Sequence, residues 1–168
     1  NVALAYDVVN PYAFEPAITP HIAAQKSGTV IDASAIQRQF YQIQQQVDSV
    51  VVEGAGGWLV PIDTTLTMAD VAIRLGLPVV LVVGIRLGCI NHALLTVDAI
   101  ECSGLPFYGW VANHIVDNTE SAAIIETLKV RISAPCLGVV PMLSKGQVMM
   151  DYLTLVDAAK PYDLTSPK

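Results

Sequence analysis

The stretch Pro78-Val79-Val80-Leu81-Val82-Val83-Gly84 is apolar between its bounding proline and glycine. It is rich in β-branched residues and shorter than a typical helix, so it predicts a buried β-strand. Strands that are apolar on both faces are typical of a parallel sheet covered by helices. We therefore expect an α/β fold with this strand as part of its sheet.

Three further segments are apolar and bounded by turn-forming residues, and each predicts a strand: Ser49–Glu53, Phe107–Asn113 and Cys136–Pro141. Amphipathic patterns predict helices at 35–47, 68–75, 91–102 and 119–132, with a weaker pattern at 148–159. Strands that alternate with helices predict βαβ units with right-handed crossovers. Residues 1–34 contain Pro11, Pro16 and Pro20 and predict an irregular arm.

The composition limits the possible functions. The 168 residues predict one domain spanning 1–168. Only 14% of the residues are charged and 53% are apolar, which favours burial of part of the surface against another subunit. The net charge of −6 argues against a nucleic-acid partner. The apolar run Leu75–Ile85 is shorter than the roughly 20 residues of a membrane-spanning helix, so we expect no membrane partner.

The cysteines indicate the compartment. There are three, Cys89, Cys102 and Cys136, an odd number without C-x-x-C spacing. This pattern argues against a disulfide framework and against a zinc site. It fits the reducing cytoplasm, where we expect the protein to act.

Glu53 is the sharpest candidate for ligand binding, because open α/β sheets bind ligands beyond the carboxyl ends of their strands. It ends a predicted strand and is followed by Gly54, Ala55, Gly56 and Gly57. A carboxylate beside glycine-rich backbone would hold Mg²⁺ next to phosphate groups. A solvated strand end followed by a tight turn gives the same pattern. Both interpretations remain open.

A second candidate lies before the predicted helix at 91–102, and consists of Gly88, Cys89, Ile90 and Asn91. Free N–H groups at a helix N-terminus attract carboxylate or phosphate. The alternative is that Asn91 is an ordinary N-cap. Cys89 has no histidine or aspartate in a pattern that would make it a nucleophile.

A third candidate is the pair Asn113 and His114, which ends the third predicted strand. An asparagine amide carries both a donor and an acceptor, so it can pair with the edge of a purine. The alternative is a turn residue that satisfies nearby backbone groups. His21 and His92 have no partner at metal-ligand spacing, and we interpret both as structural.

Taken together, three segments resemble dethiobiotin synthetases in their order and spacing: Val51–Trp58, Leu87–Ala93 and Gly109–Asn113. Asn10-Pro11-Tyr12 and Thr19-Pro20-His21 also resemble that family, and the match runs from about Asn10 to Leu143. The resemblance implies a P-loop NTPase-like three-layer fold with a mostly parallel sheet, and a homodimer. It also implies an ATP- and Mg²⁺-dependent cyclo-ligase of biotin biosynthesis.

The reaction that the resemblance implies starts from 7,8-diaminononanoate and CO₂. One amine forms a carbamate, ATP phosphorylates it, and the second amine attacks to close the ureido ring of dethiobiotin. Catalysis of phosphoryl transfer of this kind depends on positioning and on neutralisation of charge.

The resemblance also implies roles for individual residues. Glu53 would bind Mg²⁺, and the nucleotide would be bordered by Gly54, Ala55 and Gly56. The adenine would meet Asn113 and His114 on one side and, on the other, Pro141, Met142 and Leu143. The substrate carboxylate would be bound across the dimer interface by Gly88, Cys89, Ile90 and Asn91.

The sequence departs from the family in several places. The phosphate loop Gly-x-x-x-x-Gly-Lys-[Ser/Thr] and its preceding strand have no match in the 168 residues. Because the chain begins at Asn1 rather than Met, we expect this segment to be missing from its N-terminus. The 168 residues would then be roughly the C-terminal three quarters of the domain, without a catalytic residue of their own. Gly146 and Gln147 stand where the family has an acidic residue, and Ile125 where it has a tyrosine.

Two other functions remain open. A non-catalytic short paralogue would act as a dimeric interaction module and would hydrolyse no ATP. A related P-loop ATPase of cofactor synthesis would differ in sequence after the third strand.

Overall fold

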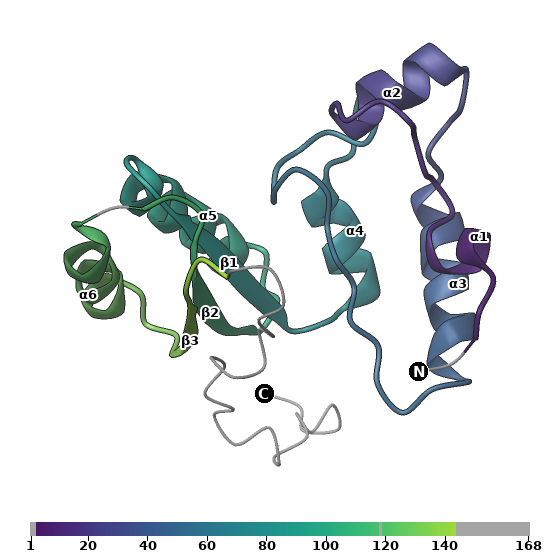
Figure 1. Ribbon diagram of the computed structural model, residues 1–168. Helices are drawn as coiled ribbons and strands as arrows, with labels where there is room; N and C mark the ends of the chain where they lie inside the picture. The colour runs from purple at the N-terminus through teal and green to yellow at the C-terminus, as the bar shows by residue number, and fades with distance from the viewer. Residues whose placement is uncertain (1–2, 118, 144–168) are drawn as a thin grey trace. The chain divides into compact units, whose positions relative to one another are not determined.

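The computed structural model describes residues 3–117 and 119–143 (Figure 1). Its elements are α1 (Tyr6–Val9), α2 (Pro20–Ser27), α3 (Ala33–Gln44), α4 (Met68–Leu75), β1 (Val79–Ile85), α5 (Cys89–Cys102), β2 (Phe107–His114), α6 (Ser121–Arg131) and β3 (Cys136–Val140). The chain forms two compact units, which are described separately. Unit 1 spans 1–77 with 102–105, and unit 2 spans 78–101 with 106–168. A single domain over 1–168 stays a prediction.

Unit 2 is built on a parallel sheet of three strands in the order β1-β2-β3. In the register, Leu81 pairs with Trp110, and Trp110 pairs with Cys136. Helix α5 connects β1 to β2, and α6 connects β2 to β3. These βαβ connections confirm the predicted α/β class with a parallel sheet, consistent with a P-loop NTPase-like fold.

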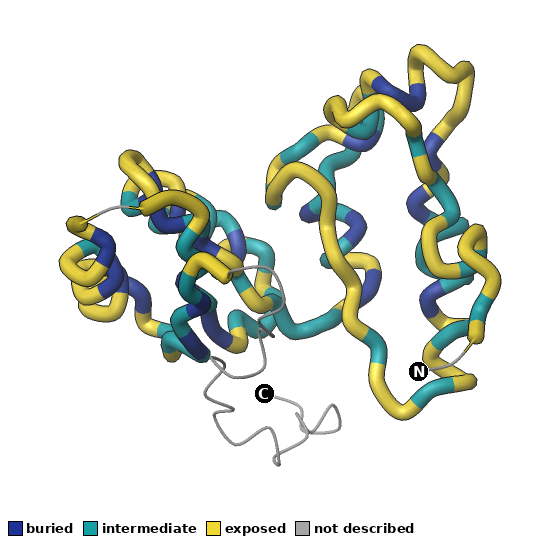
Figure 2. The backbone as a smooth tube through the Cα atoms, viewed as in Figure 1, coloured by how far each residue is buried: buried dark blue, intermediate teal, exposed yellow. Residues whose placement is uncertain are grey.

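The core of unit 2 lies between the sheet and its two helices. Alternate strand residues point into it, among them Ile85 and Trp110, which are fully buried. Leu128 of α6 is also fully buried there. Figure 2 shows the buried residues of unit 2 in dark blue. Val80 and Val82 alternate with the core residues of β1 and are exposed, Val82 to 59%. The two faces of β1 are therefore covered unequally in unit 2.

Unit 1 is mainly helical. Its core is formed by the buried residues Ala24, Ile31, Ala33, Phe40, Ile62, Val71 and Leu75. Helix α4 begins where the Asp70 carboxylate accepts hydrogen bonds from the backbone N–H and the hydroxyl of Thr67, both at 2.7 Å. It ends at Gly76, whose left-handed φ of 67° is an ordinary helix stop. These local signals explain why the predicted helix 68–75 is confirmed.

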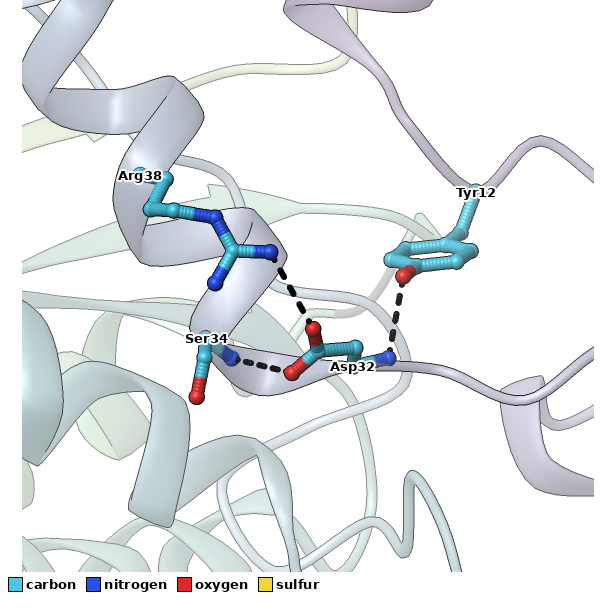
Figure 3. A network of polar contacts seen from close by, with 4 residues as sticks. All are labelled: Tyr12, Asp32, Ser34 and Arg38. Carbon is cyan, nitrogen blue, oxygen red and sulfur yellow. Dashed lines mark hydrogen bonds and ion pairs between the residues drawn. The ribbon is translucent and has the colours of Figure 1, made fainter.

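Asp32 fixes the start of α3 (Figure 3). Its Oδ1 accepts a hydrogen bond from the Ser34 N–H at 2.8 Å, and its Oδ2 lies 3.3 Å from Nη2 of Arg38. Its own N–H donates to the Tyr12 hydroxyl at 3.0 Å. The hydrogen bond from the Ser34 backbone lowers the pKa of Asp32. The network ties the segment before α2 to the first turn of α3.

The prediction of an irregular arm over residues 1–34 is wrong. This segment contains α1 and α2, and α3 begins at its end. Pro20 occupies the first turn of α2, where its missing N–H costs nothing, and Gly28 ends the helix with a φ of 68°. Both signals stand in the sequence, so α2 was predictable.

The predicted strand Ser49–Glu53 is also wrong, because the structure has no strand there. Val51 is 95% exposed. A strand needs a neighbouring backbone, and the sheet of the described residues consists of β1, β2 and β3 alone. The weaker helix prediction at 148–159 lies outside the described residues. Among the helices that the structure describes, none has the length and apolar character needed to span a membrane.

Candidate functional site

The carboxyl ends of the three strands of unit 2 meet at one edge of the sheet, because the strands are parallel. Gly84 pairs with Asn113, and Asn113 pairs with Val140. This edge therefore brings together the predicted residues that follow the three strands. They are Gly88, Cys89, Ile90 and Asn91 after β1, Asn113 and His114 at the end of β2, and Pro141, Met142 and Leu143 after β3.

Asn113 and His114 are the last two residues of β2 and are half-buried. Because they pair with Gly84 and Ile85, the interpretation of Asn113 as a turn residue is wrong. Their place at a strand end leaves the amide and the imidazole near the edge where a ligand would bind. Pro141 is half-buried, and Met142 and Leu143 are exposed.

The segment Gly88–Asn91 forms the N-terminus of α5, which begins at Cys89. Asn91 therefore lies inside the first turn, and the interpretation that it is the N-cap is wrong. Gly88 turns the chain with a φ of 86°, and the Cys89 N–H donates to the Arg86 carbonyl at 3.1 Å. Cys89 is buried and Asn91 is exposed. The first-turn N–H groups of α5 provide the positive end of a helix dipole at the carboxyl edge.

The glycine turn after Glu53 belongs to unit 1. Glu53 through Gly57 are all exposed, and the turn is made by Gly56 and Gly57 with φ of 80° and 119°. A Cβ on Gly56 would lie 3.0 Å from Cγ2 of Val60, so this turn has little room for a side chain. Exposed backbone of this kind can approach an anion closely.

The donor set for Mg²⁺ consists of one carboxylate. Glu53 is exposed, so its oxygens are open to a hard cation. No group of three or more histidine, cysteine, aspartate or glutamate side chains among the described residues could hold a metal ion. Mg²⁺ in nucleotide sites usually keeps several waters and takes one or two carboxylates together with phosphates. Glu53 fits that kind of site, in which the nucleotide supplies the other ligands.

The sequence analysis does not predict one contact at the carboxyl edge of the sheet in unit 2. A Cβ built on Gly84 would lie 2.8 Å from Cδ1 of Ile115, and the three nearest atoms all belong to that side chain. A glycine inside a strand signals such a close approach, but a glycine at the end of an apolar run also marks a strand end, so the sequence alone does not reveal this contact. Ile125, which the resemblance places at the family's tyrosine position, is buried in the core of unit 2.

Comparisons with known proteins show which family the chain resembles. A family model described as an AAA domain matches residues 2–147. Among curated proteins, the "ATP-dependent dethiobiotin synthetase BioD" of Pseudomonas paraeruginosa is 51% identical over 147 residues, 86% of this chain and 64% of that protein. The protein of the same name from Cellvibrio japonicus is 48% identical over 161 residues, 92% of this chain and 71% of that protein.

A third relative is "ATP-dependent dethiobiotin synthetase BioD 1" of Salmonella typhi, 45% identical over 139 residues, 82% of this chain and 61% of that protein. The chain thus spans about two thirds of the length of the curated relatives that it matches. The matched region covers most of this chain. The chain belongs to the dethiobiotin synthetase family.

Proposed function

We propose that the complete protein is an ATP- and Mg²⁺-dependent cyclo-ligase of biotin biosynthesis. It closes the ureido ring of dethiobiotin from 7,8-diaminononanoate and CO₂. The observation that carries this proposal is the 48% identity with a dethiobiotin synthetase of which the chain covers 71%. The matched region covers 92% of this chain.

In this function, the end of β2 binds the nucleotide base. Asn113 offers a donor and an acceptor to its polar edge, and His114 lies beside it. The residues after β3 line the other side of the base: Pro141, Met142 and Leu143. The position of both groups at one edge of a parallel sheet supports this assignment.

By the family resemblance, the glycine turn after Glu53 borders the phosphates. Gly54, Ala55 and Gly56 present exposed backbone, and Glu53 binds Mg²⁺ through its open carboxylate. When bound, Mg²⁺ neutralises charge on the phosphates and ATP supplies the phosphoryl group. The described residues contribute orientation and one metal ligand to this chemistry.

The N-terminus of α5 binds the substrate carboxylate, through Gly88, Cys89, Ile90 and Asn91. The helix dipole and the N–H groups of its first turn favour an anion there. The same helix carries exposed Leu95, and Leu87 just before it is 93% exposed. These apolar side chains support burial against a second copy, so the active form is a homodimer. The three free cysteines favour a cytoplasmic location.

The test is dethiobiotin formation by the complete protein from diaminononanoate, bicarbonate, ATP and Mg²⁺. Glu53→Gln should lower turnover at least about tenfold, because the neutral amide is a weaker Mg²⁺ ligand. Its thermal unfolding should be unchanged, since Glu53 is exposed. The matched control is Glu126→Gln, which removes an exposed carboxylate from α6, outside the candidate site.

Two results would decide against the proposal. Absence of ring closure and of ATP hydrolysis in the unsubstituted protein would favour a dimeric interaction module. ATP hydrolysis without ring closure would favour a related P-loop ATPase. If Glu53→Gln turns over as fast as the control, Glu53 is a solvated residue before a tight turn.

A further inference from the structure

Ile115 lies against the backbone of β1 at Gly84. The three atoms nearest to a Cβ built on Gly84 are Cδ1, Cγ1 and Cγ2 of Ile115, at 2.8, 3.5 and 3.7 Å. An alanine at position 84 would therefore collide with the tip of this side chain. The missing side chain of Gly84 makes room for Ile115.

This contact lies directly beside Asn113. Gly84 is the strand partner of Asn113 in the parallel register, and Ile115 follows Asn113 by two residues. The chain leaving β2 thus brings an apolar side chain back against the neighbouring strand, next to the amide. The position of Ile115 therefore depends on the absence of a Cβ at Gly84.

Large apolar side chains are exposed just after both β2 and β3. Ile115 and Val116 follow β2, and Met142 and Leu143 follow β3, with exposures between 38% and 57%. The strands β2 and β3 are neighbours in the sheet, and Asn113 pairs with Val140. Apolar residues around a few polar groups are typical of a small-molecule site.

We propose that Ile115, positioned by its contact with Gly84, forms an apolar wall of the base subsite. This inference rests on the proposed function and adds a positioning pair to it. A purine ring has apolar faces and a polar edge. Ile115 would cover one face, Met142 and Leu143 the other, and the Asn113 amide would bind the edge.

The experiment measures the affinity of the complete protein for ATP and for inorganic tripolyphosphate, each with Mg²⁺, by calorimetry. Ile115→Ala should weaken ATP binding about five- to tenfold, because it removes apolar contact with the base. Tripolyphosphate has no base, so its affinity should not change. The control is Val130→Ala, which truncates a side chain that is 84% exposed on α6.

Gly84→Ala tests the positioning role. The nearest atom is the end of a side chain rather than backbone, so the added methyl group should displace Ile115 while β1 stays paired. ATP affinity should fall about threefold or more. In an Ile115→Ala background the same substitution should have no further effect, because the side chain that it displaces is gone.

A loss of affinity for ATP but not for tripolyphosphate, with non-additive effects of the substitutions at positions 84 and 115, supports the proposal. Unchanged ATP affinity in Ile115→Ala overturns it. An equal loss for ATP and tripolyphosphate also overturns it, because that pattern indicates a structural role. An unsubstituted protein that binds neither compound refutes the proposed function itself, a result distinct from the other two.

Discussion

Unit 1 and unit 2 each bury a hydrophobic core, but among the described residues only unit 2 builds its core on a sheet. In unit 2, buried residues from β1, β2, α5 and α6 meet across distant parts of the sequence. In unit 1, many of the polar contacts are local. Asp32 caps α3, Asp70 caps α4, and Asp63 accepts hydrogen bonds from Thr65 and Leu66.

This difference indicates which interactions stabilise each unit. Unit 2 depends on packing of large apolar side chains, which is insensitive to the ionisation of surface groups. Unit 1 depends more on carboxylates that accept backbone hydrogen bonds. The two tryptophans allow this to be tested, because Trp110 is fully buried in unit 2 and Trp58 is half-buried in unit 1. Trp58→Phe and Trp110→Phe each leave a single fluorescent reporter.

The largest effect is expected from Leu128→Ala. Leu128 is fully buried in the core of unit 2, so the substitution leaves a cavity and should cost about 2–5 kcal/mol. Denaturant unfolding followed by Trp110 fluorescence in the Trp58→Phe background measures it. The neighbouring Val130→Ala should stay within about 0.5 kcal/mol of the parent. Equal effects of the two substitutions would contradict the packing of α6 described above.

A smaller loss is expected from Gly109→Ala in β2. The new Cβ would lie 2.7 Å from the carbonyl oxygen of Pro135, which accepts a hydrogen bond from the Trp110 N–H at 3.0 Å. Because this atom is backbone, the start of the β2–β3 pairing must shift, at a cost of about 1–3 kcal/mol. Gly84→Ala, which meets only a side chain, should cost less in the same assay. The reverse order would show that β3 adapts more easily than Ile115.

Asp32→Ala should destabilise unit 1 and leave unit 2 unchanged. It removes the cap of α3 and the partner of Arg38 together. Trp58 fluorescence in the Trp110→Phe background should show the loss. Arg38→Ala should have a smaller effect, since it breaks only an exposed ion pair. A similar loss for both would mean that the ion pair, not the cap, stabilises α3.

The smallest effect is a difference in acid sensitivity. The pKa values of Asp32, Asp63 and Asp70 in unit 1 lie below the ordinary 3.8, chiefly through hydrogen bonds from Ser34, Thr65 and Thr67. A lowered pKa contributes stability that is present above the unfolded value and is lost as the pH falls through the folded value.

Unit 1 should therefore lose stability below about pH 4, before unit 2 does. The measurement compares the Trp58 and Trp110 transitions at about pH 6 and about pH 3. Asp63→Asn should reduce the difference in acid sensitivity between the two units, because it removes one of the carboxylates with a lowered pKa. An equal loss of stability in the two units at low pH would show that the hydrogen bonds to these carboxylates do not make unit 1 more sensitive to acid than unit 2.

Features set by local sequence were predictable. Helix α4 lies where Thr67 and Gly76 bound an apolar pattern, and the three strands were recognised from their apolar runs to within one residue at each end. Ser49–Glu53 has the same β-branched character, but strand pairing depends on a neighbour that sequence alone does not supply. The contact of Ile115 with Gly84 was not predictable for a related reason. It depends on the parallel register of β1 and β2.

The position of β1 at the edge of the sheet affects how the 168-residue chain should behave in solution. Within the described residues β1 has one strand neighbour, and its sequence has no charge or proline between Val79 and Ile85. Natural sheet edges usually carry such residues, because they block the addition of strands from other molecules. Preparations of this chain should therefore self-associate in a concentration-dependent way. A lysine at the exposed position 82 should suppress that self-association without entering the core.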